Sequence, residues 1–426
     1  KYDYPHHLQV STGKNKQERI IECSDLLKGS LRLSASVQSL DAEVLKNTKR
    51  SNISYQALID VSSKLSDTQA NTYSEVILGL PSDSKEKFIG SVCGLIEADF
   101  NQVRMFTLMI LDGSDLATDA SRQKFKMKTR FRAVPRSFGV YKFMERELPS
   151  VEIEEVCVEQ ETLSLDDYIE CRKFALTVTL FYNDKIFHEL TQFLLGKGMR
   201  VSDWLKYVHS QRDLFPKKLL NIYKSFTVET ENELSQSRDE LEKKIKTEPG
   251  LIQKYISGEA GNNVLFNTQA QIYLEVMADL HAVAFEAARA FSGLDCSDQG
   301  SIEVAYLNEL QRYSVAKKQH FVNLEETSIE HFDFDFIALE GENFARMPTQ
   351  KKPANITFYF EGWQKDFFSD QMEKHGTSPQ GLGKLLSRIP IKKTQRATRY
   401  ADNIALENAT PQTSLSESSI SGPIII

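Results

Sequence analysis

Residues 73–98 read YSEVILGLPSDSKEKFIGSVCGLIEA, a β-rich run that leads through Gly-Leu-Pro into an amphipathic run of helix length. This order is the pattern of a βα unit. Further β-rich runs at residues 7–11, 31–37 and 103–111 are separated by other helix-length runs. Alternation of this kind predicts an α/β fold with a parallel sheet over residues 1–145. The four strands are too few to close a barrel by themselves.

The periodicity changes after residue 145. Residues 163–195, 231–246 and 268–291 each suit a helix, which predicts a mainly helical domain over residues 146–325. Near residue 330 the period becomes two, since three phenylalanines alternate with aspartates, and a second run follows at 355–362. These runs predict a pair of strands in a small α+β region over residues 326–400. The Ser- and Thr-rich residues 401–426 are predicted to be a disordered tail.

Composition narrows the class of protein. A chain of 426 residues with 41% hydrophobic content can bury a large core. Its net charge of -7 provides no broad basic field, so a nucleic-acid partner is disfavoured. The five scattered cysteines fit neither a disulfide framework nor a zinc knuckle, and indicate a reducing cytoplasm. The sequence has no run of about 18 apolar residues, so no membrane partner is expected. The chain opens without Met directly before a strand, which we interpret as truncation.

Four motifs follow the predicted strands in order. Ser11-Thr-Gly-Lys-Asn15 follows the first strand, and the second continues into SASVQSLDAEVLKNTKRSNIS at residues 34–54. The third ends in Gly79-Leu-Pro81, and the fourth ends in Asp112-Gly-Ser114. In type and order these motifs resemble the second half of the barrel of radical S-adenosylmethionine (radical SAM) enzymes, especially the cobalamin-associated members. Arg132-Ala-Val-Pro-Arg136 and Phe138-Gly-Val-Tyr141 are also similar to those members, and the resemblance covers roughly residues 7–200.

The resemblance implies a partial parallel (β/α) barrel that binds S-adenosylmethionine. In such barrels the ligand lies at the carboxyl ends of the strands. The side chains expected to bind the cofactor are Ser36, Gln38, Ser39, Arg50 and Gly79. Ser36 and Gln38 would contact the nucleoside or the amino-acid part, and Arg50 would hold its carboxylate through two hydrogen bonds. Gly79 would let the backbone approach the flat base.

The cysteine motif of the family is missing from this sequence. A radical SAM cluster is a 4Fe-4S cluster held by three cysteines spaced CxxxCxxC, because thiolates suit iron. The smallest separation here is between Cys157 and Cys171. We therefore interpret the chain as a C-terminal fragment whose cluster ligands lie upstream, and we expect it to be inactive alone. The resemblance also implies a reductant protein as partner and allows cobalamin, bound by a domain outside this chain.

Other motifs have simpler interpretations. His188-Glu189 lacks the second histidine of a zincin motif, and Gly13-Lys14 lacks the other residues of a phosphate loop. Asp333 and Asp335 suit the solvent face of a strand better than a cation site. His281 lies in an apolar helical stretch and is predicted to be a core histidine. The basic residues between 384 and 399 are predicted to be a solvated surface.

A function of another class remains open. A non-catalytic binding or scaffold protein could keep the barrel remnant and the helical domain after loss of the cluster. A CxxxCxxC motif upstream of Lys1 would favour the enzyme, and a native start at Lys1 would favour the scaffold. A third alternative, a helical protein with a chance βα segment, predicts that the strand ends do not converge. The substrate, a small molecule or another class, is not indicated.

Overall fold

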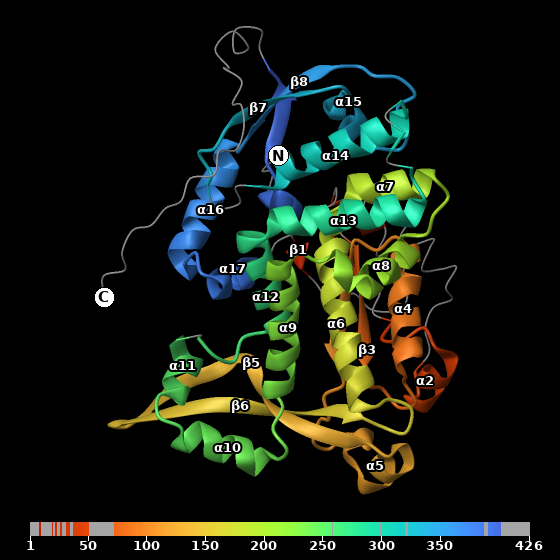
Figure 1. The fold of residues 1–426 in the computed structure, drawn as a ribbon. Helices are drawn as coiled ribbons and strands as arrows, with labels where there is room; N and C mark the ends of the chain where they lie inside the picture. The colour runs from red at the N-terminus through yellow and green to blue at the C-terminus, as the bar shows by residue number, and fades with distance from the viewer. Residues whose placement is uncertain are drawn as a thin grey trace.

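The computed structural model describes residues 8–9, 19, 22–23, 26–27, 31–34, 37–50, 72–257, 259–295, 297–298, 300–319, 323–386 and 391–401. A parallel sheet, a long antiparallel hairpin, a helical body and a second small sheet make up this part of the chain (Figure 1). In the described part of the chain, no helix combines the length and the apolar character needed to cross a membrane.

The strands fall into three sheets. The parallel sheet has the order β1-β2-β3-β4, the hairpin pairs β5 with β6, and the third sheet has the antiparallel order β7-β8-β9. Their bounds are β1 (Leu8–Gln9), β2 (Leu31–Ser34), β3 (Thr72–Leu78), β4 (Gln102–Thr107), β5 (Lys128–Phe143), β6 (Arg146–Glu159), β7 (Ser328–Phe332), β8 (Ala354–Tyr359) and β9 (Ala397–Tyr400).

The helices occur mainly between β6 and β7. In chain order they are α2 (Ala42–Asn47), α4 (Lys85–Glu97), η1 (Asp115–Ala117), α5 (Asp119–Phe125), α6 (Leu165–Phe181), η2 (Asn183–Lys185), α7 (His188–Gly196), α8 (Val201–Ser210), η3 (Arg212–Leu214), α9 (Lys217–Asn232), α10 (Arg238–Thr247), α11 (Leu251–Ser257), α12 (Val264–Glu275), α13 (Met277–Ser292), α14 (Ile302–Lys318), α15 (Phe336–Gly341), α16 (Gly362–His375), α17 (Pro379–Leu386) and η4 (Ile391–Thr394).

The α/β prediction is confirmed for the parallel sheet. All four predicted strands form, in parallel and in sequence order, and α4 follows β3 as the opening stretch of sequence predicts. Ser84 caps α4 by accepting a hydrogen bond from the backbone N–H of Lys87. The sheet is open in the described residues, so the partial barrel stays a prediction. The division into domains stays a prediction as well.

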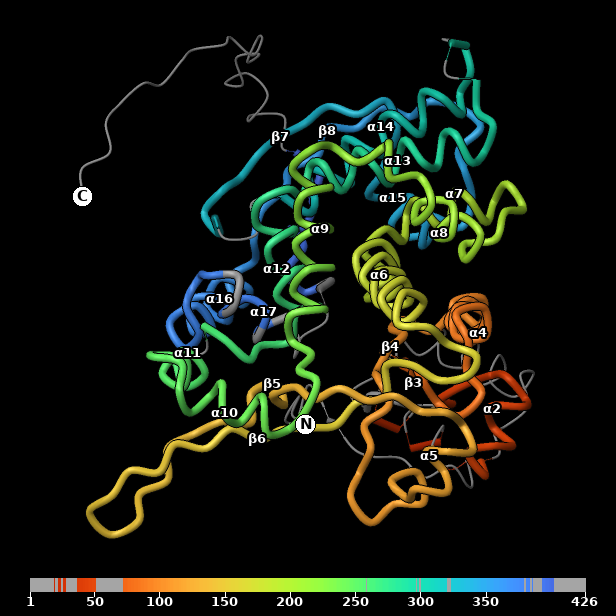
Figure 2. Tube along the Cα trace, turned by 60° about the horizontal axis from the view of Figure 1, so that its bottom comes forward, coloured from red at the N-terminus to blue at the C-terminus, as the bar shows by residue number. Residues whose placement is uncertain are grey.

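The hairpin β5–β6 was not predicted. It spans residues 128–159, and a register shift separates the pair Ala133↔Ile153 from the pair Phe138↔Val151. Its base joins the parallel sheet through the chain that continues β4: the N–H of Ile110 donates to Glu155 O (2.8 Å), and that of Cys157 donates to Leu108 O (2.9 Å). Figure 2 shows the outer part of the hairpin extending away from the body.

The prediction of one long helix over residues 163–195 is wrong, because two helices, α6 and α7, occupy this range. The side chain of Asn183 accepts a hydrogen bond from Val103 N (2.9 Å) and donates one to Val103 O (3.0 Å). Asp184 adopts φ 57 directly after it. The two hydrogen bonds to β4 stabilise the break at Asn183 more than a continuation of α6 would. The helix predicted over 268–291 also divides, at Val276, although α13 ends at Gly293 (φ 63) as predicted.

Helix α6 is the centre of the main core. Its buried residues lie all round the helix, as expected for an element enclosed on every side. Helices α4, α8, α9 and α12 pack against it, and so do β4 and β6. His281 on α13 is fully buried and its Nδ1 lies 2.8 Å from Met277 O, which confirms the prediction of a core histidine.

The third sheet differs from its prediction in where β7 ends. Phe332 is the last residue of β7, and Asp335 caps α15, so Phe334 and Phe336 lie beyond the strand. The basic stretch before residue 399 contributes β9 to this sheet. Arg396 is buried and donates to Ala316 O (3.0 Å) and Phe358 O (2.8 Å), so for this residue the predicted solvated surface is wrong.

A tight turn after β3 holds the sheet, α4 and the hairpin together. Gly79 has φ +87, and a Cβ placed on it would lie 3.0 Å from Cys157 O of β6. The buried carboxylate of Asp83 accepts hydrogen bonds from Gly79 N (3.0 Å) and Ser84 N (3.0 Å). Gln160, just after β6, accepts a bond from Ser82 N (2.9 Å) and donates one to Leu80 O (2.7 Å). Glycine is needed here for both conformation and space.

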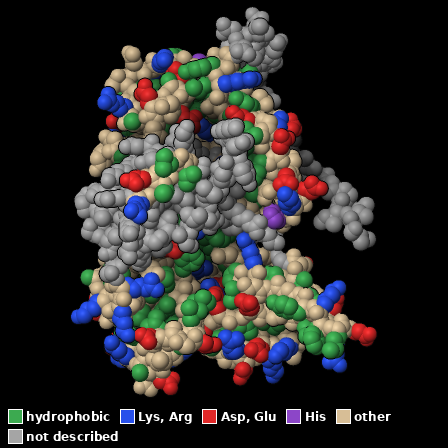
Figure 3. Space-filling view, turned by 180° about the vertical axis from the view of Figure 1, so that it is seen from behind, with side chains coloured by type: hydrophobic (Ala, Val, Ile, Leu, Met, Phe, Trp, Pro, Cys, Tyr) green, Lys and Arg blue, Asp and Glu red, His purple; other side chains and the backbone are tan. Residues whose placement is uncertain are grey.

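Charged side chains of both signs intermingle over the lower part of the rear face (Figure 3). The described part of that face therefore shows no large field of one sign. This agrees with the modest net charge of -7 for the whole chain.

The replacement Gly79→Ala should lower the free energy of unfolding by at least about 1–2 kcal/mol, because alanine disfavours positive φ and its Cβ meets the Cys157 carbonyl. Gly90→Ala is the matched control. Gly90 lies in α4 with open space around its Cβ position, so this change should stabilise the chain by about 0.5–1 kcal/mol. Urea unfolding measures both. Equal effects of the two changes would show that the turn is not constrained as described.

The turn also predicts a pH dependence of stability. Burial raises the pKa of Asp83 from 3.8 to about 7, against the lowering effect of the hydrogen bonds from Gly79 and Ser84. Between these two values the folded chain binds a proton that the unfolded chain has lost. The contribution of Asp83 is therefore most favourable below about pH 4 and declines as the pH rises through about 7.

The variant Asp83→Asn tests this dependence, since asparagine does not titrate. The free energy of unfolding of the native chain minus that of Asp83→Asn should fall between pH 5 and pH 8, and other titrating groups cancel in this difference. Urea unfolding at several pH values measures it. A difference that is flat, or that grows with pH, would contradict the raised pKa.

Candidate functional site

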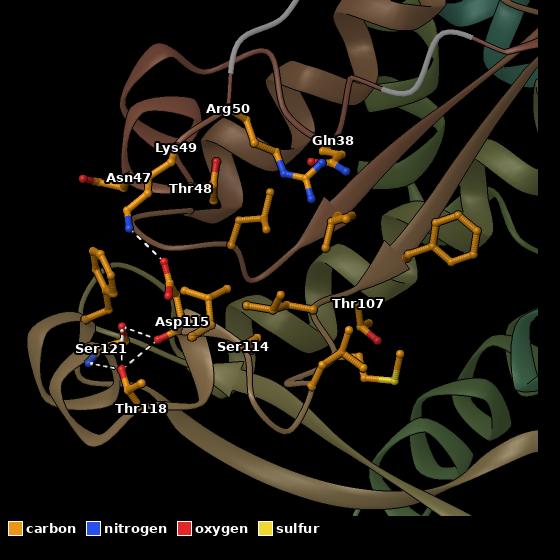
Figure 4. Close-up of a pocket in the computed structure, with 18 of the residues that line it drawn as sticks. Gln38, Asn47, Thr48, Lys49, Arg50, Thr107, Ser114, Asp115, Thr118 and Ser121 are labelled. Carbon is orange, nitrogen blue, oxygen red and sulfur yellow. Dashed lines mark hydrogen bonds and ion pairs between the residues drawn. The ribbon is translucent and has the colours of Figure 1, made fainter. Parts of the chain in front are cut away.

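A pocket of about 750 Å³ lies at the carboxyl ends of β3 and β4 (Figure 4). This is the edge at which ligands bind in parallel α/β sheets. The walls come from α2, from the ends of β3 and β4, from the η1–α5 segment and from the base of the hairpin. The lining residues are Gln38, Asn47, Thr48, Lys49, Arg50, Ile77, Leu80, Phe106, Thr107, Leu108, Met109, Leu111, Ser114, Asp115, Leu116, Thr118, Ser121, Lys124, Phe125, Arg132 and Glu154.

Helix α2 places Arg50 at this pocket. Asp41 caps the start of α2 by accepting bonds from the N–H groups of Glu43 and Val44, and the buried Val44 side chain fixes the helix on the core. At the other end Lys49 has φ 55, and Arg50 N donates to Leu45 O (2.9 Å). With the bond from Lys49 N to Lys46 O (3.1 Å), this is a Schellman motif, which turns the chain sharply after the helix.

Gln38 lies beside Arg50 and belongs to the edge of β3. Its N–H donates to Glu75 O (2.8 Å) and its carbonyl accepts from Ile77 N (2.9 Å), although its φ is 65. The side-chain oxygen Oε1 is buried and has no hydrogen-bond partner among the described residues. In Figure 4 the Arg50 guanidinium and the Gln38 amide extend toward one another. No described residue forms an ion pair with Arg50. A buried acceptor and a cation without a partner in the described chain therefore share one wall.

The other predicted site residues lie close by but do not line the pocket. Ser39 is buried against α4, where its hydroxyl lies 3.4 Å from that of Ser91 and accepts from Asp41 N (3.1 Å). Gly79 adjoins Cys157 of β6, as described above. Ser36 lies outside the described residues. The structure thus brings Gln38 and Arg50 together in the pocket, and the cofactor-binding role of all five residues stays a prediction.

One side of the pocket is apolar and partly open to solvent. Phe106, Met109 and Leu111 are 48%, 41% and 57% exposed, an unusual state for neighbouring large apolar side chains. Ile77, Leu80 and Leu108 extend this surface inward. Such a wall suits a flat, weakly polar group such as a nucleobase.

An ion pair crosses from α2 to η1 at the pocket. Lys49 Nζ lies 2.8 Å from Asp115 Oδ2, and both side chains are 80% exposed. The Asp115 carbonyl accepts hydrogen bonds from Thr118 (2.7 Å) and Ser121 (2.6 Å), which fix the η1 segment (Figure 4). Sequence reasoning missed these residues, because the contact depends on the path of the chain between β4 and α5.

The hairpin contributes a largely buried charged group to the pocket. Arg132 binds Glu154 of β6 (2.6 Å) and Glu233 next to α9 (2.7 Å), and donates to Thr107 Oγ1 at the end of β4 (3.1 Å). Burial alone would lower the pKa of Arg132, but Glu233 and Glu154 outweigh it and raise this pKa above its ordinary value. Arg132 therefore stays charged and fixes the hairpin relative to the pocket.

The other motifs serve structural contacts. His188 Nε2 lies 2.9 Å from Asn343 Oδ1, and the buried Glu189 pairs with the buried Lys318. Asp333 pairs with Lys351 (2.7 Å), and Asp335 accepts from Ala338 N (3.0 Å). Gly13-Lys14 lies outside the described residues.

The described residues hold no group of three or more His, Cys, Asp or Glu side chains that could bind a metal ion. Burial raises the pKa of the Cys157 thiol to about 12, so this cysteine is poorly suited as a thiolate ligand. The residues present do not fit a 4Fe-4S cluster of the radical SAM kind.

Two curated proteins resemble this chain. The 2-(S-pantetheinyl)-carbapenam-3-carboxylate methyltransferase of Streptantibioticus cattleyicolor is 28% identical over 199 residues, which cover 45% of this chain and 28% of that protein. The cobalamin-dependent radical SAM methyltransferase TokK of Streptomyces tokunonensis is 28% identical over 200 residues, with the same coverage.

The match thus spans only 28% of the length of either relative. No protein-family model matches the chain. Both relatives are methyltransferases by name, and the likeness to TokK supports a distant relationship to cobalamin-dependent radical SAM methyltransferases, in agreement with the resemblance seen in the motifs at the strand ends.

Proposed function

We propose that this chain is the C-terminal, S-adenosylmethionine-binding part of a cobalamin-associated radical SAM enzyme. The observation that carries the proposal is the meeting of Gln38 and Arg50 in one pocket beside an apolar wall. In the complete enzyme, S-adenosylmethionine would be the source of a 5′-deoxyadenosyl radical and methionine, with the electron for its cleavage supplied by a 4Fe-4S cluster that these 426 residues do not hold. The cobalamin part of the proposal rests on the likeness to TokK.

The pocket residues suit the separate parts of this cofactor. Arg50 can donate two parallel hydrogen bonds to a carboxylate such as that of the methionine moiety. The buried Oε1 of Gln38 can accept from a ribose hydroxyl or from the ammonium group, which would satisfy an acceptor that otherwise costs free energy. Phe106 and Met109 offer exposed apolar surface for the adenine.

The residues of this chain hold, orient and shield the ligand in this proposal. The sequence contains no CxxxCxxC motif, so a cluster of the radical SAM kind would need ligands that these 426 residues do not provide. We infer that the chain alone has no radical SAM activity. The substrate stays undefined.

The proposal predicts that the isolated chain binds S-adenosylmethionine and that Arg50→Ala weakens this binding by about tenfold to a hundredfold, because a charge-assisted hydrogen-bond pair is lost. Arg50→Lys should recover part of the affinity, since lysine keeps the charge but not the paired geometry. Isothermal titration calorimetry measures each dissociation constant.

Lys46→Ala is the matched control for Arg50→Ala. Lys46 is an exposed cation on α2, the helix that precedes Arg50, and does not line the pocket, so its loss should leave the affinity unchanged. Equal effects of the two changes would show that Arg50 acts only through its positive charge and not through specific hydrogen bonds to the ligand. A folded native chain that binds no S-adenosylmethionine would contradict the proposed function and favour the non-catalytic binding or scaffold protein.

A further inference from the structure

The outer part of the hairpin, residues 138–151, carries a stripe of exposed apolar side chains that the proposed function does not use. Tyr141 is 65% exposed, Phe143 is 61% exposed and Leu148 is 49% exposed. Met144 in the turn is 88% exposed. Figure 2 shows this part of the hairpin projecting from the body of the molecule. Large apolar side chains gathered at a projecting tip indicate an interaction surface.

The strand register places the stripe on one face. Tyr141 pairs with Leu148, and Phe143 pairs with Arg146, so these side chains share a face because strands alternate with period two. Val151 and Ile153 belong to the opposite face, where they pack against the cluster formed by α10 and α11. The face with Tyr141 and Leu148 therefore points away from the helices that support the hairpin.

A two-stranded ribbon is marginally stable in water unless its apolar face is covered. At the base of the ribbon the inner face meets that condition, because Val151 and Ile153 pack against α10 and α11, whereas the stripe with Tyr141 and Leu148 on the outer face is exposed. We therefore expect the outer face to be covered by a partner whose surface is apolar at its centre.

We propose that this face of the ribbon binds the same face of a second copy of the chain, packed face to face about a two-fold axis. Such an interface is isologous, so one patch must complement itself. The two apolar stripes would form its centre, as the inner faces of two packed sheets do.

The charges of the ribbon support a second copy as the occupant. Residues 138–151 contain two cations, Lys142 and Arg146, and two anions, Glu145 and Glu147, so the segment has no net charge to select a strongly charged partner. On the stripe face, Arg146 at the tip and Glu152 toward the base are both exposed, and neither has an ion pair among the described residues. In antiparallel packing about a two-fold axis near Pro149, Arg146 of each copy lies opposite Glu152 of the other copy.

Pro149 also favours face packing over edge pairing. It lies within β6 opposite Val140 and lacks the N–H that a further strand would need. Proline on an edge strand is one of the features by which proteins prevent added strands. The second copy is therefore expected on the face of the ribbon and not along its edge.

Sedimentation velocity of the purified chain over a range of concentrations tests the proposal. The native chain should form a dimer, and Leu148→Ser should weaken dimerisation at least about tenfold, because an apolar side chain is lost from each copy. Val140→Ser is the matched control: Val140 is also partly exposed, at 40%, but lies on the opposite face, so dimerisation should persist.

A charge exchange tests the two-fold arrangement itself. Arg146→Glu and Glu152→Arg should each weaken the dimer, and an equimolar mixture of the two variants should form heterodimers, because opposite charges then face one another. A native chain that stays monomeric at all concentrations overturns the proposal, as does a dimer that Leu148→Ser leaves unchanged. Binding of the tip to a different protein by a monomeric chain also overturns it. These results do not depend on whether S-adenosylmethionine binds.

Discussion

The close contact between Gly79 and the Cys157 carbonyl is the constraint on which the arrangement of the site depends. Because the chain after β3 lacks a side chain at this point, β6 can lie directly against the end of the parallel sheet. The Asp83 carboxylate then holds the turn through the N–H groups of Gly79 and Ser84. The base of the hairpin becomes a wall of the pocket instead of a separate element. A larger residue at position 79 would move that wall.

The parts of the fold that the sequence predicts well are those with local signals. The βα unit of residues 73–98 has a β-rich run, a cap at Ser84 and an amphipathic helix, all of which act within a few residues. The hairpin lacks such signals. In β6 only Val156, Cys157 and Val158 are fully buried. The rest of the strand is rich in glutamates, so its sequence resembles that of a solvated connector. Its pairing with β5 is decided by contacts with α10, α11 and the chain after β4.

The candidate site was predictable in part for the same reason. Gln38 and Arg50 lie within one continuous motif, and the short helix between them carries its own cap and termination signal, so their convergence follows from local structure. Ser39 occupies the same motif but its side chain alternates to the other face, toward Ser91 of α4. Arg132, Glu154 and Asp115 reach the pocket only through long-range packing. Sequence reasoning had no signal for that packing.

The guanidinium of Arg132 links the pocket to the helical part of the chain. It contacts β4 through Thr107, β6 through Glu154 and the end of α9 through Glu233, so three elements meet at one side chain. The carboxylates of Glu154 and Glu233 share this one cation. Without it, both would be unpaired charges largely shielded from water, which costs free energy. The register of the hairpin and the position of α9 are therefore coupled. A change in the helical body that moves Glu233 should alter the pocket wall even though Glu233 itself does not line the pocket.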